Sequence, residues 1–222
     1  GGVDELIEQG ERWLRVGRGF EEAQAAYEAG DWVTAILKYE GVQAVDQFYE
    51  PQTVRQHLFD SYTRLADLLA QANGGQIATL ERALAFYQQA LTQVPTDKEA
   101  NATRDVLQAW VAARNAAAEG NWAWAVSQLG GAWRAHNDLP AGKAASWLVR
   151  ACVEMAAQAT TAGASGHAQV FSDLARHVAQ QAGEALPPWA IEATPPETPS
   201  ASQTAEATSV AEPMGLIYTV QA

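Results

Sequence analysis

Turn-forming residues recur along this chain at a nearly constant interval, and that interval limits the folds open to it. Glycine-containing turns begin at four positions that are 43, 47 and 43 residues apart: Gly30, Asn73, Gly120 and Gly163. Prolines fall between these turns with spacings of 44 and 45 residues: Pro51, Pro95 and Pro140. Glycine can end a helix in the left-handed conformation, and proline can begin the next helix. The alternation therefore predicts helical hairpins repeated in tandem.

The segments between the turns have the composition and periodicity of helices. They are rich in Ala, Leu, Gln and Glu, and apolar residues recur at intervals of three and four. Asp31, Asp97 and Asn121 stand at expected helix starts, where their side chains can bond the free N–H groups of the first turn. We expect an all-α fold of about four antiparallel hairpins, with eight helices at residues 4–29, 31–46, 52–73, 77–93, 97–119, 121–137, 141–162 and 167–183.

Composition divides the chain into four parts. Residues 1–2, two glycines, are interpreted as a cloning remnant on an excised fragment, and residues 3–186 as the helical repeat domain. Residues 187–214 are rich in Ser, Thr and Pro, with acids and no Lys or Arg, which predicts a solvated acidic linker. Residues 215–222 hold a β-branched run that indicates the first strand of a truncated following domain. The alternative is that residues 216–220 dock as a peptide in a groove of the repeats.

The charge balance excludes some classes of partner. The chain carries a formal charge of −12 and has a pI near 4.7, so it repels phosphates and anionic membrane surfaces. We therefore expect no nucleic-acid partner. No apolar run approaches the ~18 residues that a membrane helix needs, so we expect no membrane insertion. The Ser/Thr/Pro linker and the single cysteine favour an extracytoplasmic location, with a cytoplasmic one as the alternative.

Small and aromatic residues also occupy fixed positions within the hairpins. Ala83, Tyr87, Ala90 and Pro95 are separated by four, three and five residues. This pattern resembles the second helix of the tetratricopeptide repeat family, whose repeat is ~34 residues long. Other residues fit the pattern in part: Gly30, Trp32, Ala35, Tyr39, Tyr62, Ala66, Gly120, Trp122, Ala125 and Ala132. With its longer period of 43–47 residues, the chain is expected to stack long hairpins into an α-solenoid or superhelix.

The resemblance implies a protein- or peptide-binding scaffold whose first helices line a concave surface. Five residues are candidates for binding a partner: Arg64, Trp110, Arg114, Trp124 and Trp147. Trp110 and Trp147 lie on first helices, where exposed rings would anchor a peptide; the alternative is that they pack between adjacent hairpins. Trp124 is expected to be exposed, because it stands two residues from Trp122 and cannot share its helix face.

No pattern for catalysis, a cofactor or a metal appears in the sequence. Phosphate-binding, dinucleotide-binding and serine-nucleophile motifs are absent. Asp173 and His177 stand one helical turn apart, but a closed metal site needs more ligands, so a surface hydrogen-bonded pair is expected. Cys152 lies in an apolar run and is interpreted as a buried thiol rather than a reactive one.

The sequence thus predicts a non-catalytic interaction module of a larger, bacterial multidomain protein that uses no cofactor. It specifies neither the partner nor the oligomeric state. The alternative is a small-ligand sensor with a Trp-lined pocket between hairpins, since the chain has eight Trp in 222 residues. An open groove would favour the interaction module, and a closed Trp-lined pocket would favour the sensor.

Overall fold

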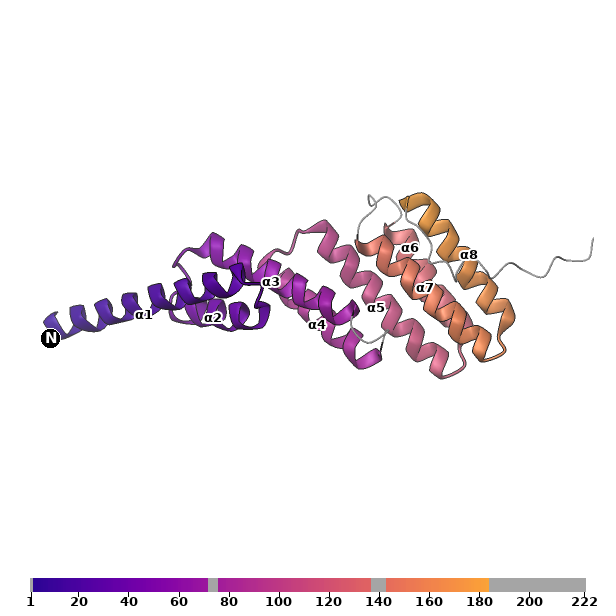
Figure 1. Cartoon of the computed structure of the whole chain (residues 1–222), viewed down its shortest axis with the longest axis horizontal. Helices are drawn as coiled ribbons and strands as arrows, with labels where there is room; N and C mark the ends of the chain where they lie inside the picture. The colour runs from indigo at the N-terminus through magenta and orange to yellow at the C-terminus, as the bar shows by residue number, and fades with distance from the viewer. Residues whose placement is uncertain (1, 72–75, 137–142, 184–222) are drawn as a thin grey trace, which may run out of the picture.

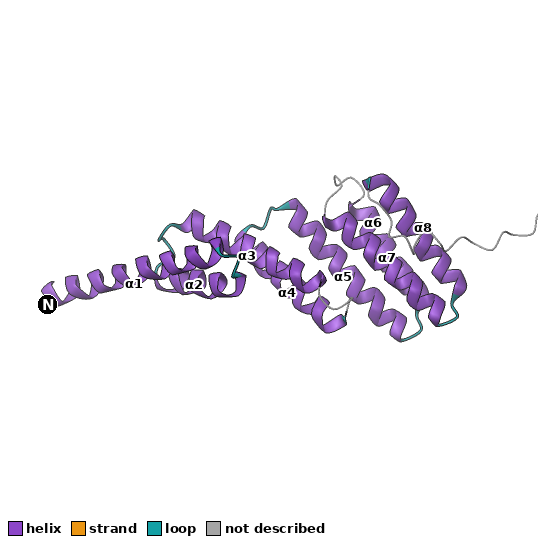
Figure 2. Ribbon diagram, viewed as in Figure 1, coloured by secondary structure: helices purple, strands orange, loops and turns teal. Residues whose placement is uncertain are grey.

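The computed structural model describes residues 2–71, 76–136 and 143–183, and within them all regular structure is helical (Figures 1 and 2). The all-α prediction is confirmed, and each helix boundary lies within two residues of the expected one. The expected linker at 187–214, the expected strand at 215–222 and the turns at Gly74 and Pro140 lie outside the described residues. The described helices are α1 (Gly2–Glu28), α2 (Trp32–Val45), α3 (Pro51–Gln71), α4 (Ile77–Gln93), α5 (Lys98–Ala118), α6 (Trp122–His136), α7 (Lys143–Thr161) and α8 (Ser165–Ala182).

Two corresponding turns show why the hairpins form where the sequence predicts. Gly30 and Gly120 adopt φ values of 74° and 75°, in the left-handed region that side chains with a Cβ atom rarely enter. After each glycine, an acceptor side chain begins the next helix. The carboxylate of Asp31 accepts a hydrogen bond from the Thr34 N–H, and the side-chain oxygen of Asn121 accepts one from the Trp124 N–H, both at 3.2 Å. These caps confirm the expected helix starts.

The four hairpins follow one another along an elongated molecule (Figure 1). Within each hairpin, α1 packs on α2, α3 on α4, α5 on α6 and α7 on α8. Between hairpins, α2 packs on α3 and α4 packs on α5, whereas the last two hairpins meet mainly through their first helices, α5 and α7. Short connections between neighbouring helices make each hairpin antiparallel.

The alanines of the repeat pattern lie at the helix contacts. Ala35, Ala83, Ala90 and Ala125 are completely buried, and Ala132 is buried as well. A methyl group at these positions lets the neighbouring helix approach closely.

Buried apolar residues form two cores. The smaller core joins α1 and α2 to part of the second hairpin and includes Tyr39, Leu58 and Ala90. The larger core runs from α3 to α8. Phe59 of α3 and Phe86 of α4 pack against both cores, so the boundary between the cores falls inside the second hairpin and not at a turn.

Candidate partner-binding surface

A recess lies between α3 and α7, on the side of the molecule formed by first helices. Its volume is about 340 Å³. Two residues of α3 and four of α7 line it: Asp67, Gln71, Lys143, Ser146, Trp147 and Arg150. The packing of α5 on α7 and the succession of hairpins bring α3 and α7 to the same side, although they are far apart in sequence.

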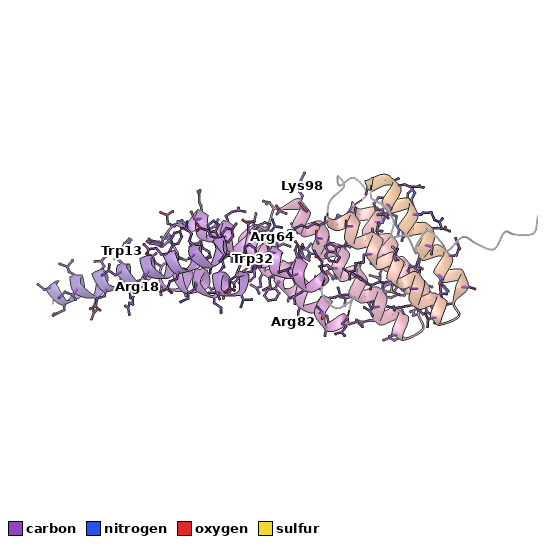
Figure 3. All side chains as sticks on the ribbon, viewed as in Figure 1. Trp13, Arg18, Trp32, Arg64, Arg82 and Lys98 are labelled. Atoms are coloured by element: carbon purple, nitrogen blue, oxygen red, sulfur yellow. The ribbon has the colours of Figure 1, made fainter. Side chains whose placement is uncertain are left out.

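A second, smaller hollow shares Lys143 with this recess. Its volume is about 160 Å³, and its lining is mostly polar. Arg64, which is labelled in Figure 3, lies here together with Asp60, Asp97 and Glu99. The structure therefore places the candidate Arg64 beside the recess but on the other side of Lys143, among acidic side chains.

Lys143 and Asp67 form the contact that joins the two walls of the recess. The Lys143 Nζ atom lies 2.8 Å from Asp67 Oδ2, and the Tyr87 hydroxyl donates a hydrogen bond of 2.6 Å to Asp67 Oδ1. Asp67 is buried, whereas Lys143 is partly exposed. Burial, together with the adjacent carboxylate, raises the pKa of Tyr87. The negative charge of Asp67 is thus balanced by two donors, each from a different helix.

Trp110 and Trp147 pack against each other beneath the recess. Their ring centroids are 6.1 Å apart, and the rings are 0% and 6% exposed respectively. Of the two interpretations open for these tryptophans, exposed anchors or packing between adjacent hairpins, their burial supports packing. The physical reason is that α5 and α7 lie directly against each other, so large side chains on their facing sides are enclosed. Trp147 nevertheless contributes to the lining of the recess.

Arg150 lies over both tryptophan rings. Its guanidinium carbon is 5.8 Å from the centroid of Trp110 and 5.4 Å from that of Trp147. Cation–π attraction of this kind contributes about 0.5–2 kcal/mol, more as the site is drier. Arg150 also lines the recess, so its guanidinium lies between the two tryptophan rings and this surface.

Arg114 is engaged in an ion pair with Glu154. The two charged groups are 3.9 Å apart and mostly buried, and Arg150 Nε lies 3.4 Å from the other Glu154 oxygen. Burial raises the pKa of Glu154, and the two arginines only partly oppose that rise. Arg114 Nη1, Glu154 Oε2 and the Trp110 N–H are buried atoms without a hydrogen-bond partner. The unpaired Trp110 N–H costs about 1–3 kcal/mol, whereas the Arg114 and Glu154 atoms face each other in the ion pair.

Trp124 lies apart from the recess. It is 53% exposed on α6, as expected, while Trp122 is partly buried. Because α6 is a second helix and none of its residues lines the recess, the structure does not bring Trp124 together with Trp147 or Arg64.

Of the six residues that line the recess, only Trp147 was among the binding candidates of the sequence analysis; the other five are Asp67, Gln71, Lys143, Ser146 and Arg150. No local pattern relates Asp67 to Lys143, because their contact depends on how the second and fourth hairpins are placed. Arg150 offered a detectable signal, since it stands three residues after Trp147 and therefore on the same helix face.

Cys152, Asp173 and His177 are the residues for which the sequence analysis considered reactivity or metal binding. Cys152 is completely buried, and burial strongly raises its thiol pKa, which confirms the buried-thiol interpretation. The expected pairing of Asp173 with His177 is wrong. Asp173 accepts hydrogen bonds from Gln169 and Arg176, while the His177 ring contacts Trp133. Within the described ranges, no group of three or more His, Cys, Asp or Glu side chains is placed to hold a metal ion.

A further hollow, between α1 and α2, has a volume of about 510 Å³. Its lining includes the apolar residues Val16, Leu37 and Val42 and the cations Arg12 and Lys38. Both cations are engaged within the hairpin. Arg12 donates a hydrogen bond of 2.7 Å to the Val45 carbonyl, and Lys38 forms an ion pair of 2.5 Å with Glu22. These two cations of the hollow are thus engaged, as Lys143 and Arg150 of the recess are with Asp67 and Glu154.

Comparison with known proteins adds no assignment. No protein-family model, no curated protein and no solved structure matches the chain. Among the described helices, none is long and apolar enough to cross a membrane. The geometry of the surface is therefore the basis for the functional proposal.

Proposed function

We propose that the chain is a non-catalytic interaction scaffold, part of a larger bacterial multidomain protein, that binds a protein or peptide in the recess between α3 and α7. The observation that supports this most is the recess itself, where Trp147, Arg150, Lys143 and Asp67 meet at one surface. The resemblance to tetratricopeptide repeats gives the same expectation, because that family binds peptides on the face of its first helices. A solenoid arrangement of the hairpins forms part of this proposal.

The charges of the recess suggest the chemistry of the partner. Lys143 and Arg150 bring two positive charges, whereas Asp67 brings one negative charge that Tyr87 and Lys143 already engage. The charged side chains that line the recess sum to one net positive charge on a chain whose formal charge is −12, with Lys143 paired to Asp67 and Arg150 to Glu154. A peptide that places a carboxylate near Arg150, which lies over the buried Trp147 ring, would be complementary.

The sensor alternative has less support. A sensor of the expected kind needs tryptophans that enclose a ligand-sized space, but Trp110 and Trp147 fill the space between α5 and α7 by contacting each other. The recess has the volume of a small-ligand site, about 340 Å³, yet two separate helices border it and the polar hollow at Lys143 continues it. An extended surface of this kind suits a peptide better than a small molecule.

Peptide-library selection against the intact chain tests the proposal. Ser146 is an exposed residue of the recess, so Ser146→Tyr should fill the recess without disturbing a core. Ser127→Tyr is the matched control, because Ser127 is exposed on α6 and lies outside the recess. We expect selected peptides to bind Ser146→Tyr at least about tenfold more weakly than the parent, as measured by fluorescence anisotropy, and Ser127→Tyr unchanged.

Two results would contradict the proposal. One is that no peptide is enriched; the other is that enriched peptides bind the parent and Ser146→Tyr equally well. If a panel of small molecules raised the melting temperature of the parent but not that of Ser146→Tyr, the sensor alternative would replace the scaffold.

A further inference from the structure

The hollow between α1 and α2 is lined by positive charges. Arg12, Arg15 and Lys38 line it, and none of its described lining residues is acidic, on a chain whose formal charge is −12. Lys38 is neutralised by Glu22, which lies outside the lining. Arg12 donates to an uncharged carbonyl, and Arg15 forms no ion pair or hydrogen bond with any residue that the structure describes. Two of the three positive charges are therefore left without a counter-ion.

The acids on the same helix do not neutralise these arginines. Glu8 and Glu11 precede Arg12 and Arg15 by one helical turn, but no ion pair forms between them among the described residues. The lining residues of α1 are separated by three, one and three positions from residue 12 to residue 19, so they share the helix face that is turned to α2. The arginines thus face the hollow and not the opposite side of α1.

The hollow also has apolar side chains that a partner can reach. Leu37 is 64% exposed and Val45 is 43% exposed, and both line the hollow from α2. Its volume of about 510 Å³ is larger than that of the recess. A surface that combines accessible apolar groups with unbalanced positive charge suits a segment that carries both apolar side chains and carboxylates.

Gly41 of α2 gives the hollow a further opening. A Cβ atom built at Gly41 would meet no atom within 4 Å, so the packing of α1 on α2 does not require glycine there. Glycine inside a helix costs about 0.5–1 kcal/mol relative to alanine. Because Gly41 lines the hollow, its missing side chain lets a bound segment approach the backbone of α2 closely.

One segment of this chain has the complementary chemistry. Residues 184–222, which lie outside the described residues, contain five glutamates and neither Lys nor Arg. Between residues 206 and 220, two of these glutamates stand close to six large apolar side chains: Glu206 and Glu212, with Val210, Met214, Leu216, Ile217, Tyr218 and Val220. This segment offers carboxylates for the arginines and apolar groups for Leu37 and Val45.

The segment can reach the hollow of its own molecule. Figure 1 shows α1 and α2 at one end of the molecule and α8 at the other. Five successive helix contacts lead from α2 to α8, through α3, α4, α5 and α7. At 8–10 Å for each contact and up to about 30 Å of offset along the helices, the distance to be crossed is about 60 Å. Residues 184–205 can extend to about 75 Å, which is sufficient.

We propose that residues 206–220 dock in the hollow between α1 and α2 of the same molecule. Glu206 and Glu212 then lie beside Arg12 and Arg15, and the apolar residues from 214 to 220 cover Leu37 and Val45. A segment tethered in this way has an effective concentration of the order of millimolar, which favours it over a free acidic peptide. The docking uses no residue of the recess, so it goes beyond the proposed function and does not depend on it.

Paramagnetic broadening of amide signals in the intact chain tests the docking. Cys152 is completely buried, so a nitroxide can be attached selectively to the thiol introduced by Ser209→Cys. We expect this label to broaden the amide signals of Gly41 and Val45. Arg12→Glu with Arg15→Glu should reduce that broadening at least about threefold, because like charges then face the segment. Adding Glu206→Arg and Glu212→Arg should restore it, since both sides are then reversed.

The matched control makes the same change of charge elsewhere. Arg55→Glu with Arg82→Glu alters two exposed arginines on α3 and α4 and should leave the broadening unchanged. Circular dichroism of each variant checks that the helices are retained. The docking is overturned if Gly41 and Val45 are not broadened, or if reversal of Arg12 and Arg15 has no effect.

A mixed sample distinguishes the two possible sources of the segment. It combines isotope-labelled chain without nitroxide and unlabelled chain that carries the nitroxide. We expect no broadening of Gly41 or Val45 in this mixture. Broadening as strong as in the singly prepared chain would show that the segment binds a second copy, which excludes docking within one molecule.

Discussion

Lys143 at the start of α7 holds Asp67 near the end of α3, with 2.8 Å between Nζ and Oδ2. The two residues belong to the second and fourth hairpins, so their ion pair spans the third hairpin. It is the contact that sets the two walls of the recess relative to each other, and Tyr87 fixes the carboxylate from a third helix.

Removing the carboxylate should cost more than removing the amine. Asp67→Ala leaves the buried Tyr87 hydroxyl without its acceptor and is expected to lower the free energy of unfolding by about 1–3 kcal/mol. Lys143→Ala removes a partly exposed group and should cost about 1 kcal/mol or less. Urea denaturation followed by circular dichroism measures both. If both variants lost the same free energy of unfolding, the Tyr87 hydroxyl would not need the Asp67 carboxylate as its acceptor.

Enlarging the repeat alanines should overpack the helix contacts. Ala83→Leu and Ala125→Leu add bulk at completely buried positions and should each cost about 1–3 kcal/mol. Ala123→Leu is the matched control, because Ala123 is exposed on α6, and its effect should stay within about 0.5 kcal/mol. Thermal melts distinguish these outcomes; three indistinguishable melts would contradict the packing of the alanines.

Two glycines close together in the chain should respond to alanine in opposite directions. Gly120 has a φ of 75°, so Gly120→Ala forces a Cβ atom into a strained conformation and should destabilise by about 1–2 kcal/mol. Gly131 lies within α6, and a Cβ atom there meets nothing within 4 Å. Gly131→Ala should therefore stabilise by about 0.5–1 kcal/mol through helix propensity. Chemical denaturation gives both values, and a shared sign would be inconsistent with the left-handed turn.

Glu154 should make one part of the stability depend on pH. Burial raises its pKa above the usual 4.5, so the folded state binds this proton more tightly than the unfolded state does. Between the raised value and 4.5, lowering the pH therefore adds stability at this site, and raising the pH removes it. Glu154→Gln cannot titrate, so the parent should gain stability relative to this variant as the pH falls from 7 toward 5. A difference between the two proteins that stays constant over this range would exclude the effect.

The hairpin boundaries were predictable because they depend on residues close together in sequence. Gly30 and Asp31 end one helix and cap the next through bonds to residues at most five positions away. The recess was not predictable in the same way. Whether Trp110 faces a partner or packs on Trp147 depends on whether α5 meets α7 or leaves a gap, which no local pattern in either helix specifies. Exposure of Trp124 followed from helix geometry alone, since Trp122 already occupies the inward side.

The position of the boundary between the two cores has a consequence for how the chain can be divided. Phe59 and Phe86 pack against both cores, and Val54, Leu58 and Tyr62 of α3 belong to the smaller one, so a cut at the turn before Pro51 would not separate two self-sufficient parts. Removing α1 and α2 would expose Val54, Leu58 and Tyr62, which they bury in the complete chain. The remaining three hairpins would then carry an exposed apolar patch. A single hairpin of the repeat is therefore not expected to fold independently. Removing hairpins one at a time should expose core residues and lead to aggregation and not to smaller stable proteins.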